Sequence, residues 1–151
     1  MKVSYEQALV MITHFTASSP EAVAYSPATQ QRAERAAKCS PFRLKLFQVL
    51  RSQSVSLQEL TDSTGIHKGY TRIPLGELAA ENELLWLLAV GLLRREVDGQ
   101  GLTDSFRLTP LGRQLLDRWQ LSETVDLKPH FQDHLYNSLS RWLRLPGWLQ
   151  N

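Results

Sequence analysis

Two histidines four residues apart, His130 and His134, form the pattern in this chain that most directly suggests metal chemistry. On a helix this spacing places both imidazoles on one face, where they could share a zinc ion. Asp133 lies between them, but the sequence offers no convincing third ligand. Surface or structural histidines are the commoner explanation of such a pair, so we assign no metal and no cofactor.

Nucleophilic catalysis has even less support in the sequence. The single cysteine, Cys39, belongs to no motif that pairs it with a histidine, and a single cysteine excludes an internal disulfide. The chain contains no Gly-x-Ser-x-Gly motif, phosphate-binding loop or dinucleotide fingerprint. We therefore expect a protein that acts by binding and is not an enzyme. The cysteine usage also agrees with the reducing cytoplasm, and we expect Cys39 to be buried.

The distribution of charge indicates where a partner would attach. The net charge of +2 conceals a basic excess over residues 27–55, where Arg32, Arg35 and Lys38 step by three and can share a helix face. Residues 74–90, in contrast, carry no base and three acids: Glu77, Glu81 and Glu83. An anionic partner should favour the first segment, although a solvated charged face is the commoner explanation of its spacing.

Hydrophobic periodicity, caps and prolines predict a mainly helical chain. The expected helices begin at Ser4 and then cover Ala28–Cys39, Pro41–Ser52, Leu57–Ser63, Pro74–Val90, Leu111–Trp119 and His130 to about Leu145. In the fifth of these helices the residues expected to pack inward are Leu75, Leu78, Leu85 and Leu88. In the last helix one apolar face is expected, formed by Phe131, Leu135, Leu139 and Trp142.

A small β-hairpin is expected between the fifth helix, which Gly91 is expected to end, and the sixth helix, which Thr109 is expected to cap. Its strands are Leu92–Val97 and Ser105–Leu108, and the residues of Asp98–Gly101 favour a turn. Thr64–Ile66 is expected to form another turn, in which Gly65 permits a tight connection between helices. The segment from His67 to Ile73 is expected to be mostly loop.

Several short pieces, in this order, resemble the winged-helix family of transcription regulators: Ser56–Leu60, Thr64–Ile66, Gly91–Arg95 and Phe106–Arg113. The resemblance covers residues 56–120 and implies a winged helix-turn-helix core whose third helix enters the major groove of DNA. The spacing from Gly65 to Gly91 is longer than is usual in that family. The whole chain is also similar to a small uncharacterised cyanobacterial family, which implies no activity.

The winged-helix resemblance implies a DNA-binding regulator of transcription. On this interpretation the loop residues Lys68, Tyr70 and Arg72 approach bases or phosphates, and Arg32 and Arg35 add general attraction. The wing would contact phosphate through Arg94, Arg95 and Arg107. However, acids lie among these arginines at Glu96, Asp98 and Asp104, and the preferred interpretation is cross-strand ion pairing on a solvated hairpin.

The acids of the helix expected over Pro74–Val90, the third helix of the winged-helix core, support a second hypothesis. Because Glu77, Glu81 and Glu83 would repel phosphates, the chain could be a winged-helix scaffold that presents this surface to a protein partner. Trp142 and Trp148 could contribute to the same kind of binding. Packing within the chain or homodimerisation is the preferred explanation of this tail, ahead of contact with a membrane surface.

The length and composition fit one soluble domain covering residues 1–151. Its parts are N-terminal helices over 1–55, the winged-helix core over 56–120 and a helical extension over 121–151. The chain is 42% hydrophobic and 21% charged, and no apolar run reaches the roughly 18 residues needed to cross a bilayer. We expect no membrane span.

Overall fold

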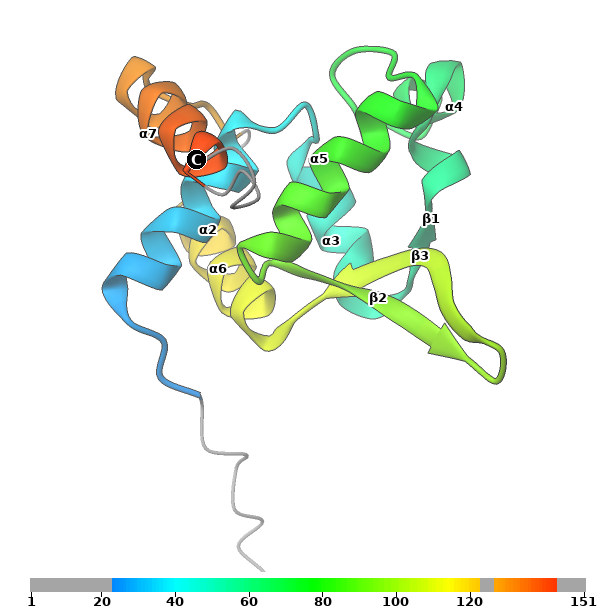
Figure 1. Cartoon of the computed structure of the whole chain (residues 1–151), viewed down its shortest axis with the longest axis horizontal. Helices are drawn as coiled ribbons and strands as arrows, with labels where there is room; N and C mark the ends of the chain where they lie inside the picture. Colours follow the sequence, from blue (N-terminus) through cyan, green and yellow to red (C-terminus); the bar gives the residue numbers. More distant parts are fainter. Residues whose placement is uncertain (1–22, 123–126, 144–151) are drawn as a thin grey trace, which may run out of the picture.

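A computed structural model describes residues 23–122 and 127–143, in which helices predominate around a small antiparallel sheet (Figure 1). The elements are α2 (Pro27–Cys39), α3 (Leu44–Ser52), β1 (Val55–Ser56), the 3-10 helix η1 (Leu57–Leu60), α4 (Asp62–His67), α5 (Glu77–Ala89), β2 (Leu93–Asp98), β3 (Gly101–Leu108), α6 (Pro110–Leu121) and α7 (Phe131–Trp142). The mainly helical class is therefore confirmed. The helix expected from Ser4 lies outside the described residues.

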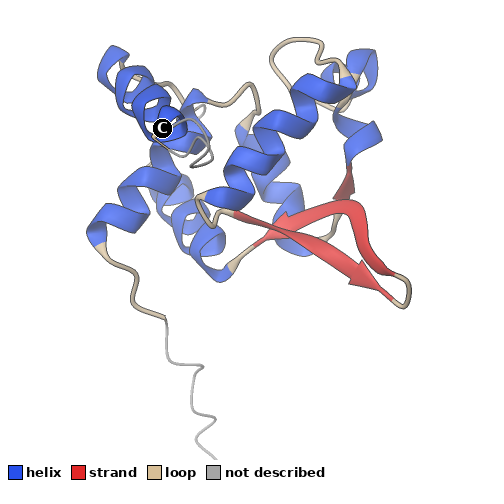
Figure 2. Cartoon of the chain, viewed as in Figure 1, coloured by secondary structure: helices blue, strands red, loops and turns tan. Residues whose placement is uncertain are grey.

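The sheet has three strands in the order β1-β3-β2, one more than the expected hairpin (Figure 2). β1 pairs Val55 with Phe106, and β2 pairs Leu93 with Leu108, both in antiparallel register. β1 is only two residues long, too short for an alternating pattern to be visible in the sequence. β3 also begins at Gly101, four residues before the strand expected there, so the hairpin is longer than predicted.

α3 begins at Leu44 and not at Pro41, because the preceding residues pair with a distant loop. Phe42 and Thr71 form an isolated antiparallel bridge. The Arg43 backbone N–H donates to the Tyr70 carbonyl at 2.8 Å, and the Arg72 N–H donates to the Pro41 carbonyl at 2.9 Å. These hydrogen bonds hold the chain extended up to the helix start.

The helix expected over Leu57–Ser63 is divided into η1 and α4, and the turn expected at Thr64–Ile66 lies inside α4. Thr61 is extended and Asp62 has a φ of 49°, so the chain changes direction between the two helices. Gly65 is therefore not a turn residue. A Cβ at Gly65 would lie 2.6 Å from the Leu60 carbonyl oxygen, which shows that close packing requires glycine there.

α5 begins at Glu77, and its buried face differs from the one expected. Its buried residues are Ala80, Leu84, Trp86 and Leu87. Leu78 is 72% exposed and Leu85 is 44% exposed, so the prediction that both pack inward was wrong. The prediction counted Leu75 as part of the helix, but Leu75 is buried in the segment before α5. Its burial therefore does not indicate which side of α5 faces the core.

Gly91 and Thr109 end and begin helices as the sequence predicts. Gly91 has a φ of 79° where the chain leaves α5 for β2, a conformation that glycine adopts without a steric penalty. Thr109 caps α6, because its Oγ1 accepts a hydrogen bond from the Gly112 N–H at 3.1 Å. The hairpin is thus bounded by local signals at both ends.

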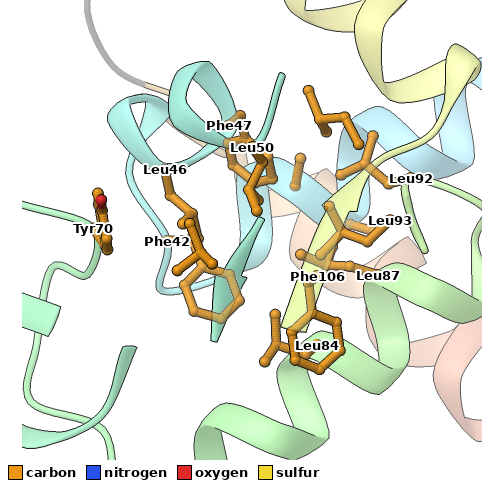
Figure 3. Close-up of a cluster of buried hydrophobic side chains, with 14 of the residues drawn as sticks. Phe42, Leu46, Phe47, Leu50, Tyr70, Leu84, Leu87, Leu92, Leu93 and Phe106 are labelled. Carbon is orange, nitrogen blue, oxygen red and sulfur yellow. The ribbon is translucent and has the colours of Figure 1, made fainter. Parts of the chain in front are cut away.

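The core lies between the sheet and the helices, and Figure 3 shows part of it. Phe42 and Phe47 come from the α3 region, Leu84 from α5 and Phe106 from β3. Each is fully buried. Burial of these large apolar side chains is the main force that fixes α5 and the hairpin relative to each other.

The start of η1 is held by a capping box between Ser56 and Glu59. The Ser56 backbone N–H donates to Glu59 Oε2 at 2.9 Å, and Lys68 Nζ donates to the other carboxylate oxygen. The Lys68 hydrogen bond, followed by that from the Ser56 N–H, lowers the pKa of Glu59 below its usual range. A lowered folded-state pKa means that ionised Glu59 stabilises the fold above its unfolded pKa, and that this contribution is lost as the pH falls through the folded-state value.

We expect Glu59→Gln to lower the free energy of unfolding at pH 7 by about 1 kcal/mol, the usual contribution of a capping interaction. The difference from wild type should shrink at pH values below roughly 4, where the unfolded carboxyl is already protonated. Urea unfolding followed by circular dichroism at pH 7 and pH 3 measures both values. An equal difference at the two pH values would contradict a role for the carboxylate charge.

Candidate binding surfaces

The loop expected to approach DNA is largely used to hold the fold together. Tyr70 is 7% exposed. Arg72 Nη1 donates to the Ser40 carbonyl at 2.9 Å, and its Nη2 donates to the Leu127 carbonyl at 2.6 Å. Lys68 is the most exposed of the three predicted residues, and it is paired with Glu59.

The arginines of the hairpin all contact acids. Glu96 lies 3.4 Å from Arg94 and 3.7 Å from Arg107. Arg95 lies 3.6 Å from Asp104 on the opposite strand, and its guanidinium is 5.4 Å from the centre of the Phe106 ring. The cross-strand ion pairing expected from the sequence is therefore present.

Two of the three acids on α5 have partners from elsewhere in the chain. Glu81 lies 3.8 Å from Arg95 of β2, and Glu83 accepts a hydrogen bond from Arg141 of α7 at 3.0 Å. Both partners lie outside the segment 74–90, so the local excess of acid is partly compensated by arginines that are distant in the sequence. Glu77, at the first turn of the helix, is exposed.

The solvent face of α5 is mostly apolar. Leu78, Asn82, Leu85 and Ala89 are all exposed and recur at steps of four, three and four residues. This spacing places them in one stripe along the helix. Sequence reasoning missed the stripe because Leu78 and Leu85 were assigned to the core.

The hairpin carries a second exposed apolar pair. Val97 of β2 and Leu102 of β3 are paired across the strands, and both are more than half exposed. The ion pair between Glu81 and Arg95 joins the hairpin to α5. The hairpin is therefore attached to the helix that carries the apolar stripe.

The predicted basic face of α2 is not a free surface. Arg35 lies 3.8 Å from Asp133 and 4.8 Å from the centre of the Tyr136 ring, both on α7. Lys38 pairs with Glu34 at 2.8 Å on the same helix. Arg32 is half-buried. Arg35 therefore contributes to helix packing.

Comparison with known proteins gives one finding. The model of the family described as Npun_F0494-like matches residues 23–141. The chain belongs to this family. No match was found among curated proteins or solved structures.

The match to the Npun_F0494-like family covers nearly all of the described structure. It begins at Val23, before α2, and ends one residue before the end of α7. The basic and acidic residues that pair between α2, α5 and α7 all lie inside it. α7 is thus part of the family domain and not an appendage beyond it.

Metal and thiol chemistry find no further support in the parts of the chain that the structure describes. These residues include no group of three histidine, cysteine or acidic side chains able to hold a metal ion. Asp133 instead accepts a hydrogen bond from the His130 backbone N–H at 2.9 Å and so helps to start α7. Cys39 is half-buried, and burial, followed by the nearby charge of Asp133, raises the pKa of its thiol.

Of the two remaining predicted residues, Trp142 is the last residue of α7. Trp142 is 67% exposed, and Trp148 lies outside the described residues. None of the helices in residues 23–122 and 127–143 has the length and apolar character needed to cross a membrane.

Proposed function

We propose that this protein is a winged-helix scaffold that binds a protein partner through the exposed stripe of α5. The order of elements supports the winged-helix assignment: α3, β1, η1 with α4, α5, β2 and β3 follow the helix–strand–helix–helix–strand–strand order of that fold. The sheet order β1-β3-β2 places the short strand beside the hairpin, as in a winged helix. The motifs of residues 56–120 agree with this assignment.

The observation that carries the functional proposal is the chemistry of the α5 stripe. In the winged-helix assignment α5 is the recognition helix, so its solvent face is the face that would enter DNA. That face has Leu78 and Leu85 exposed and contains neither lysine nor arginine. Exposed leucines at helical spacing match a protein interface better than a phosphate backbone.

The basic residues around α5 support the same conclusion. Phosphate binding by Arg94, Arg95 or Arg107 would compete with their contacts to Glu96, Asp104 and Glu81. Those acids would then face the phosphates. The electrostatic attraction that dominates DNA affinity is therefore weak at this face.

The surface also indicates the chemistry of the partner. Two exposed leucines separated by seven residues suit an apolar segment, such as one side of an amphipathic helix. Glu77 lies one residue from Leu78 and is exposed, so a lysine or arginine on the rim of the partner segment would complement it. We therefore propose an apolar partner segment with a basic rim.

Photo-crosslinking tests this proposal. A photoreactive residue at position 82, at the centre of the stripe, should form an adduct with one partner protein in native cells, whereas the same residue at exposed position 120 of α6 should not. For the identified partner, Leu78→Lys or Leu85→Lys should raise the Kd by roughly thirtyfold or more, as expected for a central apolar contact. Leu121→Lys, at another exposed leucine, is the matched control.

Several results would overturn the proposal. They are the absence of an adduct at position 82, an adduct that is equally strong at position 120, an adduct with a second copy of this chain, and partner binding unchanged by both substitutions. DNA binding is tested with the same protein. Duplex binding at low salt that weakens on Arg94→Ala and Arg95→Ala, with a reduced salt dependence, would favour the DNA hypothesis instead.

A further inference from the structure

α7 packs on the rest of the protein with its polar side inward. Its buried residue is Asn137, whose Oδ1 accepts a hydrogen bond from Trp86 Nε1 at 2.8 Å. Asp133 and Arg141, four residues to either side, face Arg35 and Glu83. α7 lies beside α2 in Figure 1, consistent with this contact. Polar contacts thus dominate the attachment of this helix.

The apolar side of α7 consequently faces solvent. Six large apolar residues at the end of the described chain are each at least half exposed: Phe131, Leu135, Tyr136, Leu139, Trp142 and Leu143. At 100° per residue, Leu135 and Leu139 lie opposite Asn137, at the centre of the exposed side. A largely apolar exposed face of this kind marks an interaction site.

We infer that this face is covered by the same face of a second copy of the chain, with the two α7 helices antiparallel. Four of the six apolar residues are placed symmetrically about Asn137. Leu135 and Leu139 lie two residues to either side of it, and Phe131 and Leu143 lie six residues to either side. In an antiparallel pair with its two-fold axis at the level of Asn137, Leu135 meets Leu139 of the other copy and Phe131 meets Leu143 of the other copy.

Charge supports a second copy over other occupants. The charged residues of α7 are Asp133 and Arg141, and both are paired with the body of the protein. Two copies of the exposed face can therefore meet without repulsion between like charges. A helix that binds a membrane surface has lysine or arginine on its polar side, whereas the polar side of α7 is packed against α2 and α5.

The available area is sufficient for such a dimer. If pairing removed about 100 Å² from each of six side chains, the two copies together would bury about 1,200 Å², the lower limit for a specific interface. Apolar burial of this size favours association, and the two-fold arrangement closes the interface so that a dimer, not a filament, results.

Sedimentation velocity on the full chain tests the inference. Wild type should form a dimer, and Leu135→Glu or Leu139→Glu should raise its Kd by roughly thirtyfold or more. The matched control is Leu78→Glu, which places the same change at an exposed leucine of α5 and should leave the dimer intact. Far-ultraviolet circular dichroism checks that each variant retains its helix content.

Crosslinking tests the register. In a Cys39→Ser background, a mixture of Leu135→Cys and Leu139→Cys chains should form mixed dimers through a short bismaleimide faster than either chain alone. A monomeric wild type, a dimer that survives both glutamate substitutions, or a dimer that dissociates equally on Leu78→Glu would overturn the inference. Because dimerisation concerns α7 and partner binding concerns α5, failure of one proposal leaves the other open to its own test.

Discussion

Replacement of Phe106 by alanine is expected to lower the free energy of unfolding by about 4 kcal/mol. Phe106 is 1% exposed and lies on β3, where it pairs with Val55 of β1 and Arg95 of β2. Removal of its ring would leave a cavity between the sheet and the core helices (Figure 3). It would also remove the surface beneath the Arg95 guanidinium. Urea unfolding at pH 7, monitored by tryptophan fluorescence, gives the value.

The matched control is Leu102→Ala on the same strand. Leu102 is exposed near the end of the hairpin, so its truncation should change the free energy of unfolding by no more than about 0.5 kcal/mol. Similar losses for the two variants would show that strand propensity, and not core burial, determines the effect of Phe106.

The second large effect is expected at Gly112, in the first turn of α6. A Cβ there would lie 2.5 Å from the Leu92 carbonyl oxygen and 2.7 Å from a Leu108 methyl carbon. The first of these contacts is with backbone, so it cannot be relieved by a change of side-chain rotamer. We expect Gly112→Ala to lower the free energy of unfolding by about 3 kcal/mol, even though alanine is the better helix former.

Gly99→Ala is the control for this substitution. Apart from its chain neighbours, no heavy atom lies within 4 Å of a Cβ built at Gly99, in the turn of the hairpin. Its replacement should therefore be nearly neutral. The same urea titration compares both variants, and a stabilised Gly112→Ala protein would show that α6 can move away from the Leu92 carbonyl at little cost.

Local signals predicted much of the fold. Thr109 starts α6 and Gly91 ends α5, as expected. Both roles depend only on the backbone close to each residue. The helix over Ala28–Cys39 differs from α2 only at its first residue. The order of motifs over residues 56–120 indicates a helical core with a hairpin without reference to any distant contact.

Long-range contacts account for the errors. α3 begins later than predicted because Phe42 pairs with Thr71. The third strand forms because Val55 pairs with Phe106, which is distant in the sequence. The prediction of the buried face of α5 was wrong because leucines lie on several sides of this helix, so the sequence pattern fits more than one choice of buried face. Only packing against the core selects Ala80, Leu84 and Leu87.

The same division applies to the binding surfaces. The sequence by itself determined that α5 carries three acids and no base, and that the last helix has an apolar side. Only the tertiary structure decided that Arg95 and Arg141 compensate two of those acids, and that α7 packs through Asn137 with its apolar side outward. The physical reason is that residue type and helical period fix which side chains share a face, whereas the partner of each face depends on segments far away in the chain.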